Sequence, residues 1–312
     1  MSKNYGVIFE PLEEEDYVFG AERIVDNITM DGNWTPYLPK DEVQTKEIRT
    51  MACVSFSANS CIETIFNYQI KHGMLSVGAL SWLEENGYME NGEVNLSDRF
   101  LATISDTTKE GNSGKKVAQA IHEVGCIPES MHPFTEGIFK WNDYYSMPTT
   151  EMFDMAYEFN ERFLINYEAV YKKDFKEALK HSPLQVYVYA WNGYENGEYV
   201  KTDKPINHAV ELHKGTWYVF DTYEKLDSFS KKLAEDFIFF NIGYKYKLSE
   251  KKPMTNVKVL KDANSNEVGF LLPAINSDAF KSLGANFGID VPTKEGQTDW
   301  SKVKIDGEYE LT

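Results

Sequence analysis

The sequence predicts an α+β fold in which helices come first and strands follow. Between residues 50 and 130 the apolar residues recur at helical spacing, whereas residues 184–246 hold alternating runs rich in β-branched and aromatic residues. The 312-residue length and 42% hydrophobic content allow one large domain, or a medium domain with a small one. Helices grouped ahead of strands, rather than alternating with them, are typical of an α+β protein.

The clearest helix is expected to follow Thr50, a potential N-cap three residues before Cys53. Its buried face is predicted to contain Phe56, Cys61, Ile62, Ile65, Phe66 and Ile70. In its first turn, unpaired N–H groups and the helix dipole would lower the pKa of the Cys53 thiol and favour the nucleophilic thiolate. The alternative is an inert structural cysteine, because free cysteine is often fully buried.

Other elements follow from local patterns. Further helices are predicted over 74–86, after an N-cap at Ser97, over 115–124 behind a glycine-rich loop, and over the long amphipathic stretch 150–180. Strands are predicted at 184–191, 208–213, 216–223 and 237–246, with turns at Asn192-Gly193 and Asn196-Gly197.

The last 62 residues are expected to form a separate unit, which divides the chain into domains 1–250 and 251–312. The second is predicted to be small and mostly β, with hairpins over 257–272 and over 301–311 around Asp306-Gly307. Residues 262–266 faintly resemble a calcium loop but lack its glycine and distal glutamate, so a polar turn is favoured. This unit could dock to other proteins.

Charge and cysteine content exclude several classes of function. A net charge of −17 argues against nucleic acid or an anionic membrane as a partner. Three cysteines form neither a disulfide framework nor a paired zinc motif, so no metal and no cofactor is expected. The absence of an 18-residue apolar run and of a signal-peptide pattern predicts a soluble protein.

Two motifs carry a resemblance to a known family. The segment Ala-Cys-Val-Ser-Phe-Ser-Ala at 52–58 resembles the active-site block of papain-like cysteine peptidases, with Val54 where the family usually has Trp. Asn207-His208-Ala209-Val210 resembles the family's motif at its catalytic histidine. The resemblance implies a two-lobed fold, with a helical half and an antiparallel β half separated by a cleft. The acidic extension 1–33 could cover that cleft.

The resemblance also implies roles for single residues. Cys53 would be the nucleophile and His208 the base. Asp221, in place of the usual Asn, would accept the Nδ1 proton of His208, and His213 would point to the opposite face of its strand. Gln44, nine residues before Cys53, would hold the oxyanion. The resemblance further assigns peptide substrate binding to Gly111, Asn112, Ser113, Gly114 and Asn207.

Three functional hypotheses therefore stay open. The first is a peptidase that hydrolyses peptide or protein substrates, and the second is a catalytically weak or inactive structural or binding protein on the same fold. Residues 34–58 also resemble papain-like proteins of bacterial viruses, which would suit a virion component. The third hypothesis is transferase or deamidase use of the same Cys–His pair.

Overall fold

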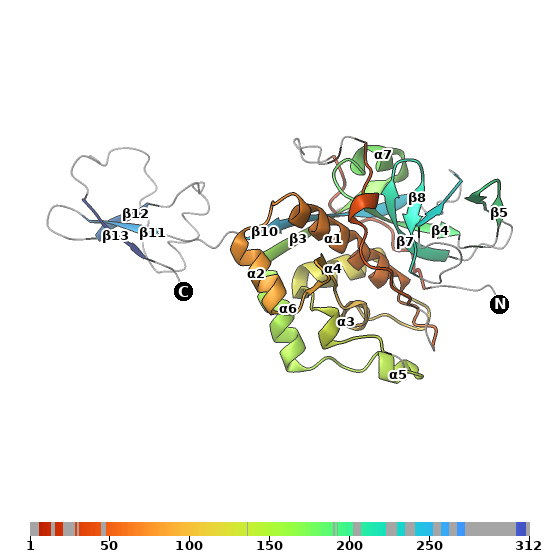
Figure 1. Ribbon diagram of the computed structural model, residues 1–312, viewed down its shortest axis with the longest axis horizontal. Coiled ribbons are helices and arrows are strands. Elements are labelled where there is room, and N and C mark those ends of the chain that lie inside the picture. Colours follow the sequence, from red (N-terminus) through yellow and green to blue (C-terminus); the bar gives the residue numbers. More distant parts are fainter. Residues whose placement is uncertain are drawn as a thin grey trace. The chain divides into compact units, whose positions relative to one another are not determined.

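The computed structural model describes residues 6–13, 16–20, 29, 31–44, 48–135, 137–189, 191, 193–201, 207–222, 230–234 and 241–251, together with the backbone of three strands beyond residue 256. Two compact units divide the chain, residues 1–251 and 252–312 (Figure 1). The expected calcium-like loop at 262–266 and the Asn192 turn position lie outside the described residues.

The helices of unit one lie mostly ahead of its sheet. Those that the structure describes are α1 (Cys53–Lys71), α2 (Val77–Glu85), α3 (Asp98–Ile104), α4 (Gly114–Val124), α5 (Trp141–Tyr144), α6 (Thr150–Arg162) and α7 (Phe175–Ala178). Short 3₁₀ turns lie at Thr35–Tyr37, Glu129–Met131 and Lys172–Asp174. Two small hairpins, β1 (Met89–Glu90) with β2 (Glu93–Val94) and β5 (Tyr194–Glu195) with β6 (Glu198–Tyr199), complete the connections.

Side-chain caps fix the start of several helices. The Ser97 hydroxyl accepts a hydrogen bond from Phe100 N at the start of α3, as the sequence predicts. Ser113 caps α4 in the same way through Lys116 N. The predicted cap Thr50 is wrong, because α1 has Ala52 at its N-cap position with no side-chain hydrogen bond.

One antiparallel sheet forms the second half of the unit. Its strand order is β3 (Phe163–Tyr171), β10 (Ile242–Glu250), β4 (Leu184–Tyr189), β7 (Asn207–Lys214), β8 (Tyr218–Phe220) and β9 (Ser230–Lys232). The predicted helix over 150–180 is therefore wrong beyond Arg162, where the chain enters β3 and pairs with β10 along nine residues. The Asn196-Gly197 turn joins β5 to β6 as predicted, with positive φ angles of 52° and 85° that suit a type I′ turn.

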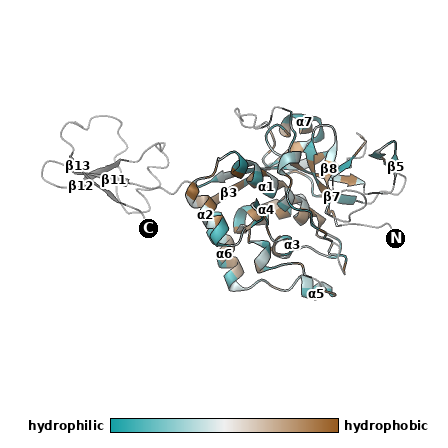
Figure 2. Cartoon of the chain, viewed as in Figure 1, coloured by the Kyte–Doolittle hydropathy of each residue, from teal (hydrophilic) through white to brown (hydrophobic). Residues whose placement is uncertain are grey.

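Helix α1 is the centre of the unit. Figure 1 shows it between helices α3 and α4 and strands β4 and β7, and it contacts α3, α4 and β7. All but three of its 19 residues are buried. The outer helix α6 is by contrast largely hydrophilic on the side seen in Figure 2, and only Ala156 and Phe159 of that helix are buried. Because α1 is buried on every side, its apolar residues are spread around the helix and do not form a single stripe.

The sheet has an apolar core on each face, because side chains alternate along a strand. On β4, Tyr187 packs into the core shared with α1, whereas Val186 and Val188 pack into the second core with Trp34. The indole of Trp34 is completely buried, and its Nε1 donates a 2.6 Å hydrogen bond to Leu179 O. The chain before α1 is thereby attached to the far face of the sheet.

The second unit contains a three-stranded antiparallel sheet of order β12 (Glu267–Leu271), β11 (Val257–Lys261) and β13 (Lys304–Tyr309). The pairing of β11 with β12 agrees with the predicted first hairpin. The predicted turn at Asp306-Gly307 is wrong, because both residues lie inside β13, which pairs with β11. Among the described helices of the whole chain, none is long and apolar enough to cross a membrane.

Candidate active site

Cys53 lies at the first position of α1, against strand β7. Its thiol is completely buried, and burial raises the pKa of that thiol to about 12. A hydrogen bond from the backbone of Ala209 partly offsets this effect. Since Ala209 directly follows His208, the fold brings the cysteine and the histidine motif together across 155 residues of chain.

His208 and Asp221 form a buried, hydrogen-bonded pair. His208 lies on β7, Asp221 directly follows β8, and the two strands are neighbours in the sheet. The distance from His208 Nε2 to Asp221 Oδ1 is 2.7 Å, and neither side chain is exposed to solvent. The predicted contact of Asp221 with Nδ1 is wrong, because Asp221 binds Nε2. The Nδ1 nitrogen lies on the other side of the imidazole ring.

Lys231 on β9 completes this group. Its Nζ lies 2.8 Å from Asp221 Oδ2, and its side chain is 2% exposed. Burial alone would raise the pKa of Asp221, but the His208 and Lys231 contacts outweigh burial and lower it. The carboxylate therefore stays ionised and can orient the imidazole.

Trp191 covers the same group. Its ring lies edge-on to His208 with centroids 6.0 Å apart, and the ammonium of Lys231 lies 5.0 Å from its centroid. His213, in contrast, has Thr35 and Ser230 as its hydrogen-bonding partners. Sequence reasoning missed both Lys231 and Trp191, because no local motif marks either residue.

Gln44 is buried beside the Asp221 group. Its backbone N–H donates to Thr222 O at 2.8 Å, and Thr50 Oγ1 donates to Gln44 O at 3.1 Å. The amide nitrogen Nε2 is buried and makes no hydrogen bond to any residue that the structure describes. A buried donor without an acceptor costs stability, so its presence fits a donor held ready for a ligand oxygen.

The segment of residues 6–10, here called the N-terminal strap, lies along the predicted substrate-binding residues. Asn112 N donates to Gly6 O at 2.8 Å and Ile8 N donates to Asn112 O at 2.7 Å, which makes a parallel β-bridge at Val7. The other predicted residues meet the strap as well: Ser113 Oγ donates to Glu10 Oε2, Asn207 Nδ2 donates to Val7 O, and Gly111 packs on the Gly6 backbone. Gly114 lines a small cavity with Ile8, Phe9 and Glu10.

The thiol of Cys53 has no solvent-exposed surface. The lowered pKa predicted from its place at the helix N-terminus is wrong for this structure, because the desolvation of a buried thiol outweighs the effect of the helix dipole.

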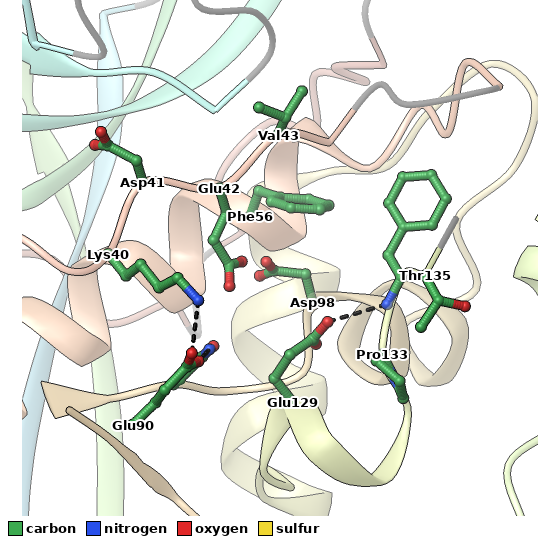
Figure 3. Close-up of a pocket in the computed structure, with 12 residues that line it drawn as sticks. Lys40, Asp41, Glu42, Val43, Phe56, Glu90, Asp98, Glu129, Pro133 and Thr135 are labelled. Carbon is green, nitrogen blue, oxygen red and sulfur yellow. Dashed lines mark hydrogen bonds and ion pairs between the residues drawn. The ribbon is translucent and has the colours of Figure 1, made fainter. Parts of the chain in front are cut away.

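An acidic pocket lies next to the Gln44 segment. Figure 3 shows the carboxyl groups of Glu42, Asp98 and Glu129 gathered in it, with Lys40 paired to Glu90 at one side. Burial, and after it the neighbouring Glu42, raises the pKa of Asp98 well above its ordinary value. The described residues contain no group of His, Cys, Asp and Glu side chains arranged to hold a metal ion.

Comparisons with known proteins identify the fold. No family model matches the sequence, and no curated protein sequence matches it. Among solved structures the chain is similar to xylellain, a cysteine protease from Xylella fastidiosa, with a TM-score of 0.53 and 13% identity over 81% of this chain and 98% of that one.

Two other solved structures match more weakly. The procathepsin B S9 of Trypanosoma congolense matches with a TM-score of 0.49 and 14% identity over 80% of this chain and 87% of that one. A recombinant stem bromelain precursor matches with a TM-score of 0.44 and 18% identity over 70% of this chain and 69% of its own. None of the three supports the expected viral origin. The helical half, the antiparallel sheet and the similarity to xylellain together show that the chain has an α+β, papain-like fold.

Proposed function

We propose that the protein is a cysteine peptidase that hydrolyses peptide bonds through Cys53 and His208. The observation that carries this proposal is the buried 2.7 Å hydrogen bond between His208 and Asp221, on the strand that also contacts the Cys53 thiol. A buried ionised carboxylate on Nε2 fixes the tautomer and the orientation of the imidazole. This arrangement suits proton transfer to and from a nucleophile.

The proposed reaction has two halves. His208 takes the proton of the Cys53 thiol, and the thiolate attacks the peptide carbonyl carbon to form a tetrahedral intermediate. The backbone N–H of Cys53 and the Nε2 of Gln44 donate to its oxyanion. His208 then gives its proton to the leaving amine as the C–N bond breaks, and water hydrolyses the thioester to regenerate the thiol.

The strap has to leave for this reaction to occur. It lies on the residues that would bind a peptide, so the structure corresponds to a closed, resting form under this proposal. Once the strap and its desolvating effect are gone, the helix N-terminus and His208 would favour the thiolate of Cys53.

The test is Cys53→Ala against a peptide library, with Cys126→Ala as the matched control. Cys126 is also a buried free cysteine, and it follows α4, where its carbonyl oxygen accepts a hydrogen bond from the Tyr88 hydroxyl. Cys53→Ala should abolish turnover while Cys126→Ala retains it. Unchanged turnover in Cys53→Ala would overturn the proposal.

A second candidate is a non-catalytic binding protein on the same fold, which the complete burial of Cys53 and its raised pKa favour. Reaction with one equivalent of a thiol-directed peptidyl electrophile at pH 6 separates the two. Rapid, selective labelling of Cys53 supports the peptidase, and no labelling after the strap is displaced supports the binding protein.

A further inference from the structure

Two glycines meet backbone to backbone where the N-terminal strap crosses the site. Gly6 has a φ of 111° and Gly111 a φ of 110°, both in the left-handed region that favours glycine. A Cβ added to Gly6 would overlap the carbonyl group of Met51, and a Cβ added to Gly111 would overlap the backbone of Gly6. The path that the strap follows between Met51 and Gly111 is here called the groove. At Gly6 it is bounded on both sides by backbone atoms that no side-chain rotation can move.

The constriction lies beside the proposed nucleophile. Met51 is two residues before Cys53, and Gly111 begins the loop that leads into α4. Met51 itself has a φ of 58°, which turns the backbone at this point. The next strap residue, Val7, is 4% exposed and belongs to the same apolar cluster as Cys53. Ile8 and Phe9, at 38% and 49%, are largely outside.

We infer that this groove selects peptides with a glycine at the constriction between Met51 and Gly111, followed by a small apolar residue, and that Gly6-Val7 is an internal copy of such a sequence. The backbone of Asn112 and the side chain of Asn207 bind only the backbone of a peptide, so they hold any sequence that enters. The constriction, in contrast, rejects every residue with a Cβ. The inference rests on the proposed function only in treating the groove as the place where substrate binds.

The first experiment displaces the strap from the groove in the full-length chain and measures the exposure of Cys53. Gly6→Ala should expel the strap, because its methyl group has no space and its φ becomes strained. Gly20→Ala is the matched control, since Gly20 has a φ of 90° but nothing within 4 Å of an added Cβ. Iodoacetamide labelling, read by peptide mass, should rise at least tenfold at Cys53 in Gly6→Ala and stay unchanged in Gly20→Ala. Cys61 and Cys126 are internal references for global unfolding.

The second measurement tests selectivity by binding, independently of turnover. The protein used in this binding measurement is the full chain with Gly6→Ala and Cys53→Ala. The probes are fluorescent ten-residue peptides with the sequence of residues 4–13 (Asn-Tyr-Gly-Val-Ile-Phe-Glu-Pro-Leu-Glu), with glycine or with alanine at the third position. The glycine peptide should bind at least tenfold more tightly than the alanine peptide. Equal affinities, or no binding of the glycine peptide, would overturn the inference.

Turnover by the Gly6→Ala chain with Cys53 intact then separates the two proposals. Selective binding of the glycine peptide without hydrolysis of any peptide would support the groove's selectivity and contradict the peptidase. Hydrolysis of alanine-substituted and glycine peptides at equal rates would support the peptidase and overturn the selectivity.

Discussion

At the scale of single residues, Asp221 has two buried partners, and both of them lower the pKa of its carboxyl group. It accepts from His208 on one oxygen and from Lys231 on the other, and all three side chains are almost fully buried. Breaking such a group on one side leaves a buried charge without its counter-ion. Removing one member of this group should therefore change the free energy of unfolding more than breaking an isolated surface ion pair would.

Asp221→Asn should destabilise the fold by about 3–5 kcal/mol, because the ammonium of Lys231 loses its carboxylate in a buried site. The double variant Asp221→Asn with Lys231→Met removes the charge as well and should recover most of that loss. Urea unfolding of the three chains measures both effects. Equal stability of the single variant and the unchanged chain would show that Lys231 reaches water instead.

Gln44→Ala should lower kcat by about 10²–10³-fold with little change in stability, because its Nε2 has no acceptor to lose among the described residues and its Oε1 accepts only a long 3.5 Å hydrogen bond from Thr222 Oγ1. Gln185→Ala is the contrasting control. The Nε2 of Gln185 donates to Val54 O and to Ser57 Oγ, so its loss should cost about 1–3 kcal/mol. Kinetics and urea midpoints of the two variants check this, and a fall in stability of Gln44→Ala with unchanged kcat would make Gln44 a structural residue.

Single residues were predictable where a motif is local. Ser97 occupies the cap position that its sequence context implies. The contact of Lys231 with Asp221 could not be predicted. The sequence Ser230-Lys231-Lys232 is polar and carries no motif, and the contact forms only when β9 pairs with β8. The nitrogen of His208 that Asp221 binds also depends on ring orientation in the folded chain, which no spacing rule supplies.

At the scale of elements, the stretch 150–180 shows how tertiary pairing overrides a sequence pattern. Its apolar residues fit a helical period, yet after Arg162 the chain follows β10 in antiparallel register from Phe163–Glu250 to Tyr171–Ile242. Helical and strand patterns overlap in short apolar runs, and the partner strand that decides between them lies about 80 residues later in the sequence. The ends of the sheet were for that reason less predictable than its centre.

Two buried carboxyl groups lie along α1, and their titration should be measurable. Glu211 on β7 accepts from Thr64 Oγ1 on α1 at 2.9 Å, and burial raises its pKa well above the ordinary value. Glu63 on the same helix accepts from Leu96 N, and its pKa is raised by burial and by Glu42. A carboxyl group with a raised folded-state pKa stabilises the fold below its unfolded pKa, and this stabilisation is lost as pH rises through the folded pKa.

Glu211→Gln should therefore weaken the pH dependence of stability. The amide keeps the acceptor for Thr64 and cannot ionise, so the variant should gain stability relative to the unchanged chain as pH rises above about 4, the ordinary range of carboxyl groups. Urea unfolding between pH 4 and pH 8 measures this gain, with Glu85→Gln, an exposed position on α2, as control. A constant difference across that range would show that Glu211 ionises freely in the fold.

At the scale of the whole molecule, the order of helices before strands was enough to predict the α+β class. Cys53 and His208 of the proposed site were predictable because each lies in a local motif, whereas Lys231 and Trp191 lie in none. The contact of Gly6 with Gly111 was not, because it joins positions more than a hundred residues apart and depends on backbone shape at both. That residues 1–33 could cover the cleft followed only from their place in the chain, whereas the glycine pair explains how the strap packs against Gly111 and Asn112.

The division of the chain into two compact units predicts that the first folds without the second. All the apolar core clusters described belong to residues 1–251, and every residue of the proposed site does as well. A domain with its own core folds without its neighbour. Deleting residues 252–312 should therefore leave the Tm of the remaining chain, and the labelling rate of Cys53, equal to those of the full chain. Differential scanning calorimetry and iodoacetamide labelling measure the two quantities. A lower Tm together with faster Cys53 labelling would contradict the independence of the two units.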